Sequence, residues 1–483
     1  TFTSGGMTLN NADSKLVLDS ITLDSASTSS DSLGLDVDTN STITSLSVGH
    51  ITPLSIATGK RLSGAVTVTA GSIKLNETGT IASSVTMTGG TLDVDETSTL
   101  TGALTQSGDI TIDVATGKTL TYSYSVNALY LGANTLTLSG GGTFKNTNAL
   151  VLNNADSLLS MADTLTVEWV NVTANSNANK GLVVNASGTI EELKVFGETF
   201  LKIANGITFS GATEIAEGAN VNLSSTGTFG STLNLKGTLQ VGANQTVSGL
   251  ISIGGDSTIT IPASTTLTYT GGNINIGANT LSIGGAGTLS NANDSALVPN
   301  VTDSIIKLSG TGVIAGPVKL ESGKLKTTGS PTISGTLTQH GDSIIEIGET
   351  KTLTYQGPAL EIGAYELTLS GGGSFASGGL TLNNAQSKLV LNSITLDNAT
   401  TSANNLGLDV NINSTVTNLS IGHTTPVSIA SGVTLSGAIG VTAGSLKLND
   451  IGTLASNVSM SGGTLDVDQS ATVAGNLSHS ADI

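Results

Sequence analysis

Apolar and polar residues alternate along this chain in short runs that are separated by glycine-rich corners. In residues 60–114, Val66 and Val68, and then Val85 and Met87, alternate with threonines. Alternation with a period of two, over runs of a few residues, is typical of β-strands. The pattern therefore predicts an all-β protein built from short strands and tight turns.

The alternating pattern returns at a fixed interval. Leu62, Ile81 and Leu100 open three similar segments at equal spacing, and Leu120 follows one position later than this spacing would place it. Such a repeat indicates a solenoid, whose turns stack on one another. We therefore predict a parallel β-helix (a β-solenoid) with about 19 residues per turn and about 25 turns (483/19), a rod on the order of 120 Å long.

Residues in the same phase of the repeat are expected to lie above one another. The predicted inward stack consists of Val66, Val85 and Leu104. The predicted outward ladder consists of Thr67, Thr86 and Thr105. Flat threonine arrays on β-solenoids can bind ice, but the second copy of this segment has Gly440, Ser459 and Ser478 at these positions. A surface matched to a lattice would keep its methyl groups, so ice binding is not favoured.

A longer repeat is superimposed on the short one. Residues 1–110 and 374–483 align without a gap, with 72 of 110 positions identical. Passages that begin Thr-Leu-Thr-Tyr and lead to a glycine run mark joints at 119–144, 266–289 and 352–375. We predict one continuous β-solenoid over 1–483, with internal modules 1–142, 143–287, 288–373 and 374–483, the last a truncated copy of 1–110. Neither end resembles a cap, so we expect a window on a longer chain, or ends that pair head to tail with other copies.

Composition and charge exclude several classes of partner. The net charge is −18, with 61 glycines, 3% aromatic residues and a single arginine, Arg61. Without a basic stripe, nucleic-acid binding and electrostatic attachment to an anionic membrane are not expected. The chain has no cysteine, which excludes disulfides and thiolate metal sites. No apolar run is long enough for a membrane-spanning helix.

Paired acidic residues are the candidate metal ligands. Asp93 and Asp95, and Asp466 and Asp468, lie two residues apart, as do Asp36 and Asp38. At this spacing both carboxylates point to the same face of a strand, where a calcium ion could bridge them with help from the next turn. The alternative is that they are solvated charges on a threonine-rich surface. No other cofactor is expected.

A catalytic site is not expected. Polysaccharide-cleaving β-helix enzymes need clustered acids, often with Arg or Lys, and one arginine with scattered lysines argues against a lyase-type site. An acid-pair hydrolase stays as an alternative. The histidines are His50, His340, His423 and His479. His50 and His423 are repeat-related, which favours a place in a turn over a catalytic role.

Residues 157–200 are the least regular part of the chain. Met161, Glu168, the single tryptophan Trp169 and the pair at 191–192 interrupt the Thr/Ser/Gly pattern. One interpretation is a wider turn that Trp169 fills. The other is a lateral contact site.

The 19-residue turn and motifs such as Gly-Gly-Thr-Leu-Asp-Val at 89–94 resemble bacterial surface β-helix proteins, namely filamentous-haemagglutinin-like adhesins and autotransporter passengers with β-strand repeats. The resemblance covers nearly the whole chain. It implies a right-handed coil, an extracellular or cell-surface location, and a role in adhesion or in a surface fibre.

These observations lead to three functional hypotheses. The first is a structural segment of a long extracellular repeat protein that forms a rod, fibre or stalk and self-associates head to tail or laterally. The second is an adhesin that binds a glycan or another cell-surface ligand. The third is a polysaccharide-degrading β-helix enzyme.

Overall fold

The computed structural model describes residues 1–3, 6–178, 180–292 and 294–480. Within these residues the protein is all-β and contains no helix, so no helix is present that could span a membrane. Parallel sheets stack as a β-solenoid of about 24 turns with about 20 residues per turn, which confirms the predicted fold class. Contacts divide the chain into two compact units, Thr1–Gly249 and Leu250–Ile483, which we describe separately.

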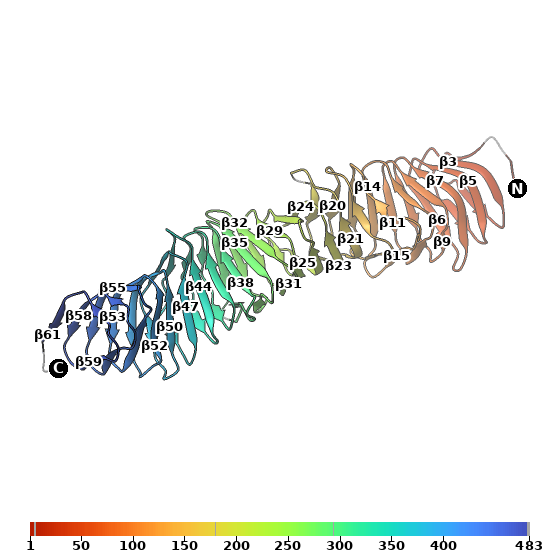
Figure 1. The fold of residues 1–483 in the computed structure, drawn as a ribbon. Coiled ribbons are helices and arrows are strands. Elements are labelled where there is room, and N and C mark those ends of the chain that lie inside the picture. The colour runs from red at the N-terminus through yellow and green to blue at the C-terminus, as the bar shows by residue number, and fades with distance from the viewer. Residues whose placement is uncertain (4–5, 179, 293, 481–483) are drawn as a thin grey trace. The chain divides into compact units, whose positions relative to one another are not determined.

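The first unit contains two kinds of sheet, in which neighbouring strands pair in parallel (Figure 1). Its first sheet contains β1 (Met7–Leu9), β3 (Thr22–Thr28), β5 (Ser41–Val48), β7 (Arg61–Val68), β9 (Thr80–Ile81), β10 (Ser84–Met87), β12 (Ser98–Leu100), β13 (Leu104–Gln106), β15 (Thr119–Tyr122), β16 (Leu129–Tyr130), β18 (Thr143–Asn146), β19 (Leu150–Leu152), β21 (Thr166–Val172), β23 (Gly188–Val195), β25 (Thr208–Ile215), β27 (Thr228–Phe229), β28 (Thr232–Leu235) and β30 (Gln245–Val247). Its second sheet contains β2 (Lys15–Leu18), β4 (Gly34–Val37), β6 (Thr52–Ile56), β8 (Ser72–Leu75), β11 (Thr91–Val94), β14 (Ile110–Val114), β17 (Thr135–Ser139), β20 (Leu158–Met161), β22 (Gly181–Val184), β24 (Glu198–Ile203), β26 (Asn220–Leu223) and β29 (Thr238–Val241).

The second unit repeats this arrangement and adds a four-stranded sheet. Strands of the first kind are β31 (Ile251–Ile253), β33 (Thr266–Tyr269), β36 (Thr288–Asn291), β39 (Val313–Ile314), β42 (Thr332–Ile333), β45 (Thr352–Tyr355), β46 (Leu360–Ile362), β48 (Ser374–Ser377), β49 (Leu380–Leu382), β51 (Thr395–Thr401), β53 (Ser414–Ile421), β55 (Thr434–Val441), β57 (Thr453–Leu454), β58 (Asn457–Met460), β60 (Thr472–Val473) and β61 (Leu477–His479). Strands of the second kind are β32 (Ser257–Ile261), β35 (Thr280–Gly285), β38 (Ile305–Leu308), β41 (Lys324–Thr327), β44 (Ser343–Ile347), β47 (Glu366–Ser370), β50 (Lys388–Asn392), β52 (Gly407–Ile412), β54 (Thr425–Ile429), β56 (Ser445–Leu448) and β59 (Thr464–Val467). The four-stranded sheet contains β34 (Ile274–Asn275), β37 (Leu297–Val298), β40 (Val318–Leu320) and β43 (Leu337–Gln339).

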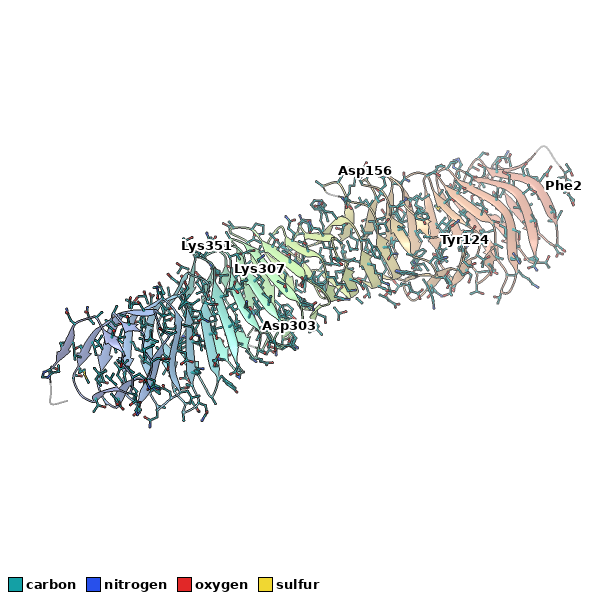
Figure 2. The ribbon with its side chains drawn as sticks, viewed as in Figure 1. Phe2, Tyr124, Asp156, Asp303, Lys307 and Lys351 are labelled. Atoms are coloured by element: carbon teal, nitrogen blue, oxygen red, sulfur yellow. The ribbon has the colours of Figure 1, made fainter. Side chains whose placement is uncertain are left out.

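The register confirms the predicted stacks. Val85 pairs with Val66 in the turn before it and with Leu104 in the turn after it, and all three side chains are buried. The threonines that follow them, at 67, 86 and 105, pair in the same register and form the predicted outward ladder. The same alternation continues in the second unit, where Lys307 of β38 projects outward between buried neighbours (Figure 2). Burial of each aliphatic side chain contributes about 1.5–3 kcal/mol, and this contribution is repeated at every turn.

The turns vary in length around the predicted value of about 19 residues. Leu92 pairs with Ile112, and Ile112 pairs in turn with Leu138, so the second of these intervals is clearly the longer. Leu100 pairs with Tyr122 and not with the predicted Leu120, which lies opposite Ser98. Extra residues are placed in loops between strands, so the strands keep their register while the sequence interval changes.

A buried tyrosine marks each of the three predicted joints. The Thr-Leu-Thr-Tyr strands β15, β33 and β45 pair with β18, β36 and β48, the strands that follow the glycine runs. Each tyrosine hydroxyl accepts a hydrogen bond from the backbone N–H of a residue in the preceding turn, at 3.2 Å. The three pairs are Tyr122 with Leu104, Tyr269 with Ile251 and Tyr355 with Leu337. The hydroxyl thus satisfies a buried donor that would otherwise lack a partner.

The long strands bend at a point where adjacent turns come very close. The register shifts between β5 and β7 at Ile43/Leu46, and a glycine, Gly64, stands opposite the bend. A Cβ atom on Gly64 would lie 1.8 Å from the carbonyl oxygen of Ile43, and its φ is 115°. Gly211 and Gly437 repeat this arrangement in the other long strands. Only glycine fits this approach of two backbones.

Candidate functional site

The predicted acidic pair at 93 and 95 lies against a lysine. Lys74 and Asp93 are register partners on β8 and β11, so their side chains leave the same face of the sheet. The ammonium Nζ of Lys74 lies 3.1 Å from Asp93 Oδ2 and 3.3 Å from Asp95 Oδ2. The lysine therefore occupies the position between the two carboxylates that a bridging cation would take.

The other predicted pairs repeat this arrangement in part. Lys447 Nζ lies 3.2 Å from Asp466 Oδ2, and Asp468 is exposed beside them. Lys15 forms an ion pair with Asp36. Over the residues that the structure describes, no group of three or more His, Asp or Glu side chains is placed to hold a metal ion. The sequence contained the signal for this pairing, because the short repeat separates Lys74 from Asp93 and also Lys447 from Asp466.

The charge on Asp93 is poorly compensated despite its lysine. Burial raises the pKa of the Asp93 carboxyl above its usual range, and Lys74 offsets only part of this effect. The carboxylates of Asp95 and Asp113 raise the pKa further, Asp113 being its register partner on β14. The hydrogen bond to Asp93, in turn, is the largest cause of the raised pKa of Lys74. The Lys74 ammonium is thus shared between two carboxylates, those of Asp93 and Asp95.

In the second unit, one carboxylate is held by two lysines. Glu346 on β44 contacts Lys324 Nζ at 2.6 Å and Lys326 Nζ at 2.7 Å. Hydrogen bonds from these lysines lower the pKa of Glu346. The arrangement is a stabilising ion-pair cluster on the outer face of the sheet.

The histidines do not come together. His50 and His423 are exposed at equivalent turns, where the backbone carbonyl of each accepts a hydrogen bond from a threonine hydroxyl at 3.1 Å. His479 is exposed on β61. His340 lines a surface groove described below.

Trp169 lies on the outer face of β21, so the prediction that it fills a wider turn is wrong. The interior at this level is occupied by Val167, Val170 and Val172, which are fully buried. The turn itself is wide, since the interval from Val167 to its register partner Ile190 exceeds the short repeat. The indole is half-buried because β21 bends at this point and turns two consecutive side chains, at 168 and 169, outward.

Beside Trp169 is a surface groove of about 430 Å³, which we call the Trp169 groove. Three neighbouring turns contribute to it: the loop before β16 together with β16, the segment around β19, and β21. Its lining residues are Val126, Asn127, Ala128, Tyr130, Asn148, Ala149, Val151, Trp169, Asn171 and Thr173. The sequence had singled out Trp169, but Tyr130 was missed because it lies far earlier in the chain, in a different turn.

A second groove lies at the corresponding joint of the second unit. It has a volume of about 350 Å³ and includes His340, Tyr355, Glu361 and Asn383. Asn383 Nδ2 donates a hydrogen bond to Glu361 Oε2 at 2.9 Å. This groove, which we call the Glu361 groove, therefore has a polar and charged lining.

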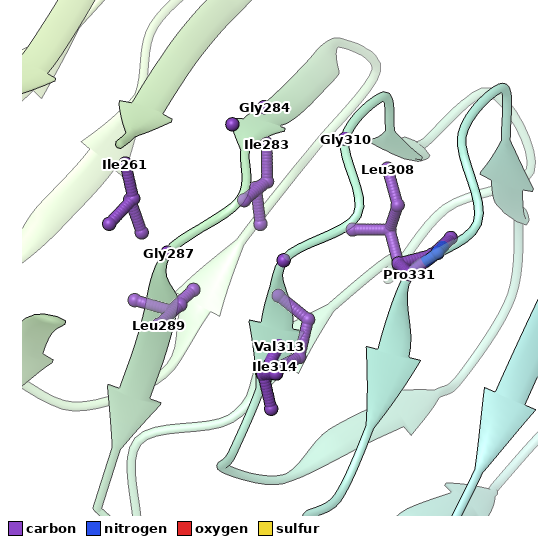
Figure 3. Close-up of a pocket in the computed structure, with 12 residues that line it drawn as sticks. Ile261, Ile283, Gly284, Gly287, Leu289, Leu308, Gly310, Val313, Ile314 and Pro331 are labelled. Carbon is purple, nitrogen blue, oxygen red and sulfur yellow. The ribbon is translucent and has the colours of Figure 1, made fainter. Parts of the chain in front are cut away.

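A small interior cavity lies near the glycine corners of the second unit (Figure 3). Its volume is about 10 Å³, and Ile261, Ile283 and Leu308 line it together with corner glycines. This space is about that of a single water molecule, and its lining is apolar. The cavity is a packing gap and offers no ligand site.

No protein-family model, no curated protein and no solved structure matches this chain.

Proposed function

We propose that this chain is a structural segment of a long extracellular repeat protein that forms a rod, fibre or stalk at a bacterial cell surface. The observation that carries the proposal is the register of its turns, with like residues stacked at Val66, Val85 and Leu104. Such stacking gives a core that grows in one dimension, as a spacer requires.

The surface chemistry supports the same proposal. The carboxylates that the sequence singled out are paired with lysines on neighbouring strands, as in Lys74 with Asp93 and Lys447 with Asp466. These carboxylates are thus occupied by ammonium groups of the protein itself. This use of the acidic residues favours a structural role over the alternative of a polysaccharide-degrading enzyme, whose acids would face a substrate.

The proposal is tested by locating the protein on the cells that make it. Antibodies raised against this chain are used for immunogold electron microscopy of intact and sectioned cells. We expect gold particles along filaments or stalks outside the envelope. Labelling confined to the cell interior would refute the proposal, and so would labelling of the medium without any extended structure.

A further inference from the structure

The Trp169 groove has an uncharged lining. None of its ten lining residues carries a formal charge. Ligand sites typically enclose about 300–1,000 Å³, and the groove lies within this range. A lining without charges has no group that would pair with an ion. A neutral ligand can enter such a groove without removing water from a charged side chain.

Two aromatic side chains stand in the groove. Tyr130 is 51% exposed, and the indole of Trp169 is held by two contacts. Its Nε1–H donates to Asn171 Oδ1 at 3.1 Å, and the Lys194 ammonium lies 5.7 Å from the ring centroid. Lys194 is itself paired with Glu192 at 2.5 Å. These contacts fix the indole before any ligand arrives, and a rigid aromatic surface loses little entropy on binding.

Asparagine amides surround the rings. Asn148 Nδ2 donates a hydrogen bond to the carbonyl oxygen of Tyr124 at 2.8 Å, and Asn171 Oδ1 accepts the hydrogen bond from the indole. Asn127 is exposed, and Asn148 and Asn171 are half-buried, at the lining of the groove. An amide supplies both a donor and acceptors, which matches a hydroxyl group that does the same.

The fold does not require these aromatic residues. In the second unit, β51 has Asn398 at the position that Trp169 takes on β21, and β46 has Glu361 where β16 has Tyr130. Both equivalents are accommodated with the same pattern of buried neighbours. The aromatic side chains of the Trp169 groove are therefore not needed to build the solenoid.

We propose that the Trp169 groove binds a neutral saccharide chain. The rings of Trp169 and Tyr130 pack against the C–H faces of the sugar, and the amides of Asn127, Asn148 and Asn171 bond its hydroxyl groups. Stacked rings combined with amides satisfy both surfaces of a sugar, which is apolar on its ring faces and polar at its edge. This binding role is independent of the structural role proposed above.

The single tryptophan makes the test direct, because its fluorescence reports on the groove alone. The full chain is titrated with cellohexaose, maltohexaose, mannohexaose and xylohexaose, and with polygalacturonate as the charged comparison. We expect a saturable change of emission with at least one neutral hexasaccharide and none with polygalacturonate. No change up to about 10 mM of any neutral probe would overturn the proposal.

Variants that copy the second unit locate the binding. Tyr130→Glu copies Glu361 and is read by fluorescence, and Trp169→Asn copies Asn398 and is read by calorimetry. Each should weaken binding about tenfold or more, because buried aromatic anchors dominate such sites. The control, Glu361→Ala in the Glu361 groove, should leave the affinity unchanged. Equal affinity for the saccharide in all three folded variants would overturn the proposal. It would also be overturned if the protein bound no saccharide and Tyr130→Glu instead abolished self-association.

Discussion

The three joint tyrosines give the sharpest stability prediction, and Tyr122 serves as the test. Its side chain is 1% exposed, and its hydroxyl accepts the Leu104 N–H at 3.2 Å. Tyr122→Phe keeps the ring that fills the interior and removes only the acceptor. The Leu104 N–H is then left buried without a partner, which costs about 1–3 kcal/mol.

This cost should be seen at one amide. Because about 1.4 kcal/mol corresponds to tenfold, hydrogen exchange at the Leu104 amide should become roughly 5- to 150-fold faster in Tyr122→Phe. Site-resolved exchange is preferable to a single unfolding free energy, since long repeat arrays do not unfold in one step.

A matched control keeps the same chemistry at an exposed site. Tyr130→Phe removes a hydroxyl from a side chain that is 51% exposed, so exchange at Leu104 should not change. Unchanged Leu104 exchange in Tyr122→Phe would refute the assigned hydrogen bond. Equal acceleration by both variants would show that the effect is not local.

Three further predictions concern glycine corners and charges. Gly64→Ala should lower the free energy of unfolding by roughly 4 kcal/mol or more, because its Cβ would lie 1.8 Å from a backbone oxygen. Gly59→Ala, whose Cβ would meet nothing within 4 Å, should cost only about 1–2 kcal/mol for its positive φ. Equal losses of stability in denaturant unfolding would contradict the close approach at Gly64. Lysine contacts lower the folded-state pKa of Glu346, so the stability that this carboxylate contributes is fully present above its unfolded pKa near 4.5. This stability is lost as the pH falls through the folded-state pKa. Glu346→Gln should therefore flatten this part of the pH–stability curve, and an unaltered curve would rule the cluster out as its cause. The Asp93→Asn variant should have a melting temperature no lower than that of the parent at neutral pH, because burial raises the pKa of Asp93 and disfavours the charged carboxylate. A clearly lower melting temperature would mean that the ion pair with Lys74 outweighs the effect of burial.

The sequence was sufficient to predict the strands and their stacking between residues 62 and 106. There the turns have constant length, and so the residues at 66, 85 and 104 align both in the sequence and in space. At the joints the same reasoning assigned Leu120 to the stack that Tyr122 occupies. A longer loop lengthens a turn without moving its strands. The residue types alone do not indicate how many residues belong to the loop.

The candidate site was predicted less well for a similar reason. The i, i+2 acidic pairs are evident in the sequence, whereas the partner of Asp93 follows only when the short repeat is used to place Lys74 beside it. Trp169 was noticed as irregular, while its outward direction depends on the bend in β21 that breaks the alternation. Tyr130 reaches the same groove through pairing between turns of unequal length, which a fixed period does not predict.

The in-register stacking of turns is most directly tested by a distance between two neighbouring turns. The chain has no cysteine, so Thr67→Cys and Thr86→Cys can be introduced together and spin-labelled without background. Their backbones should lie about 4.8 Å apart, as in paired strands, and electron paramagnetic resonance should show strong dipolar broadening at this pair. A spectrum equal to the sum of the two singly labelled proteins would place the residues in separate regions and contradict the stacked solenoid.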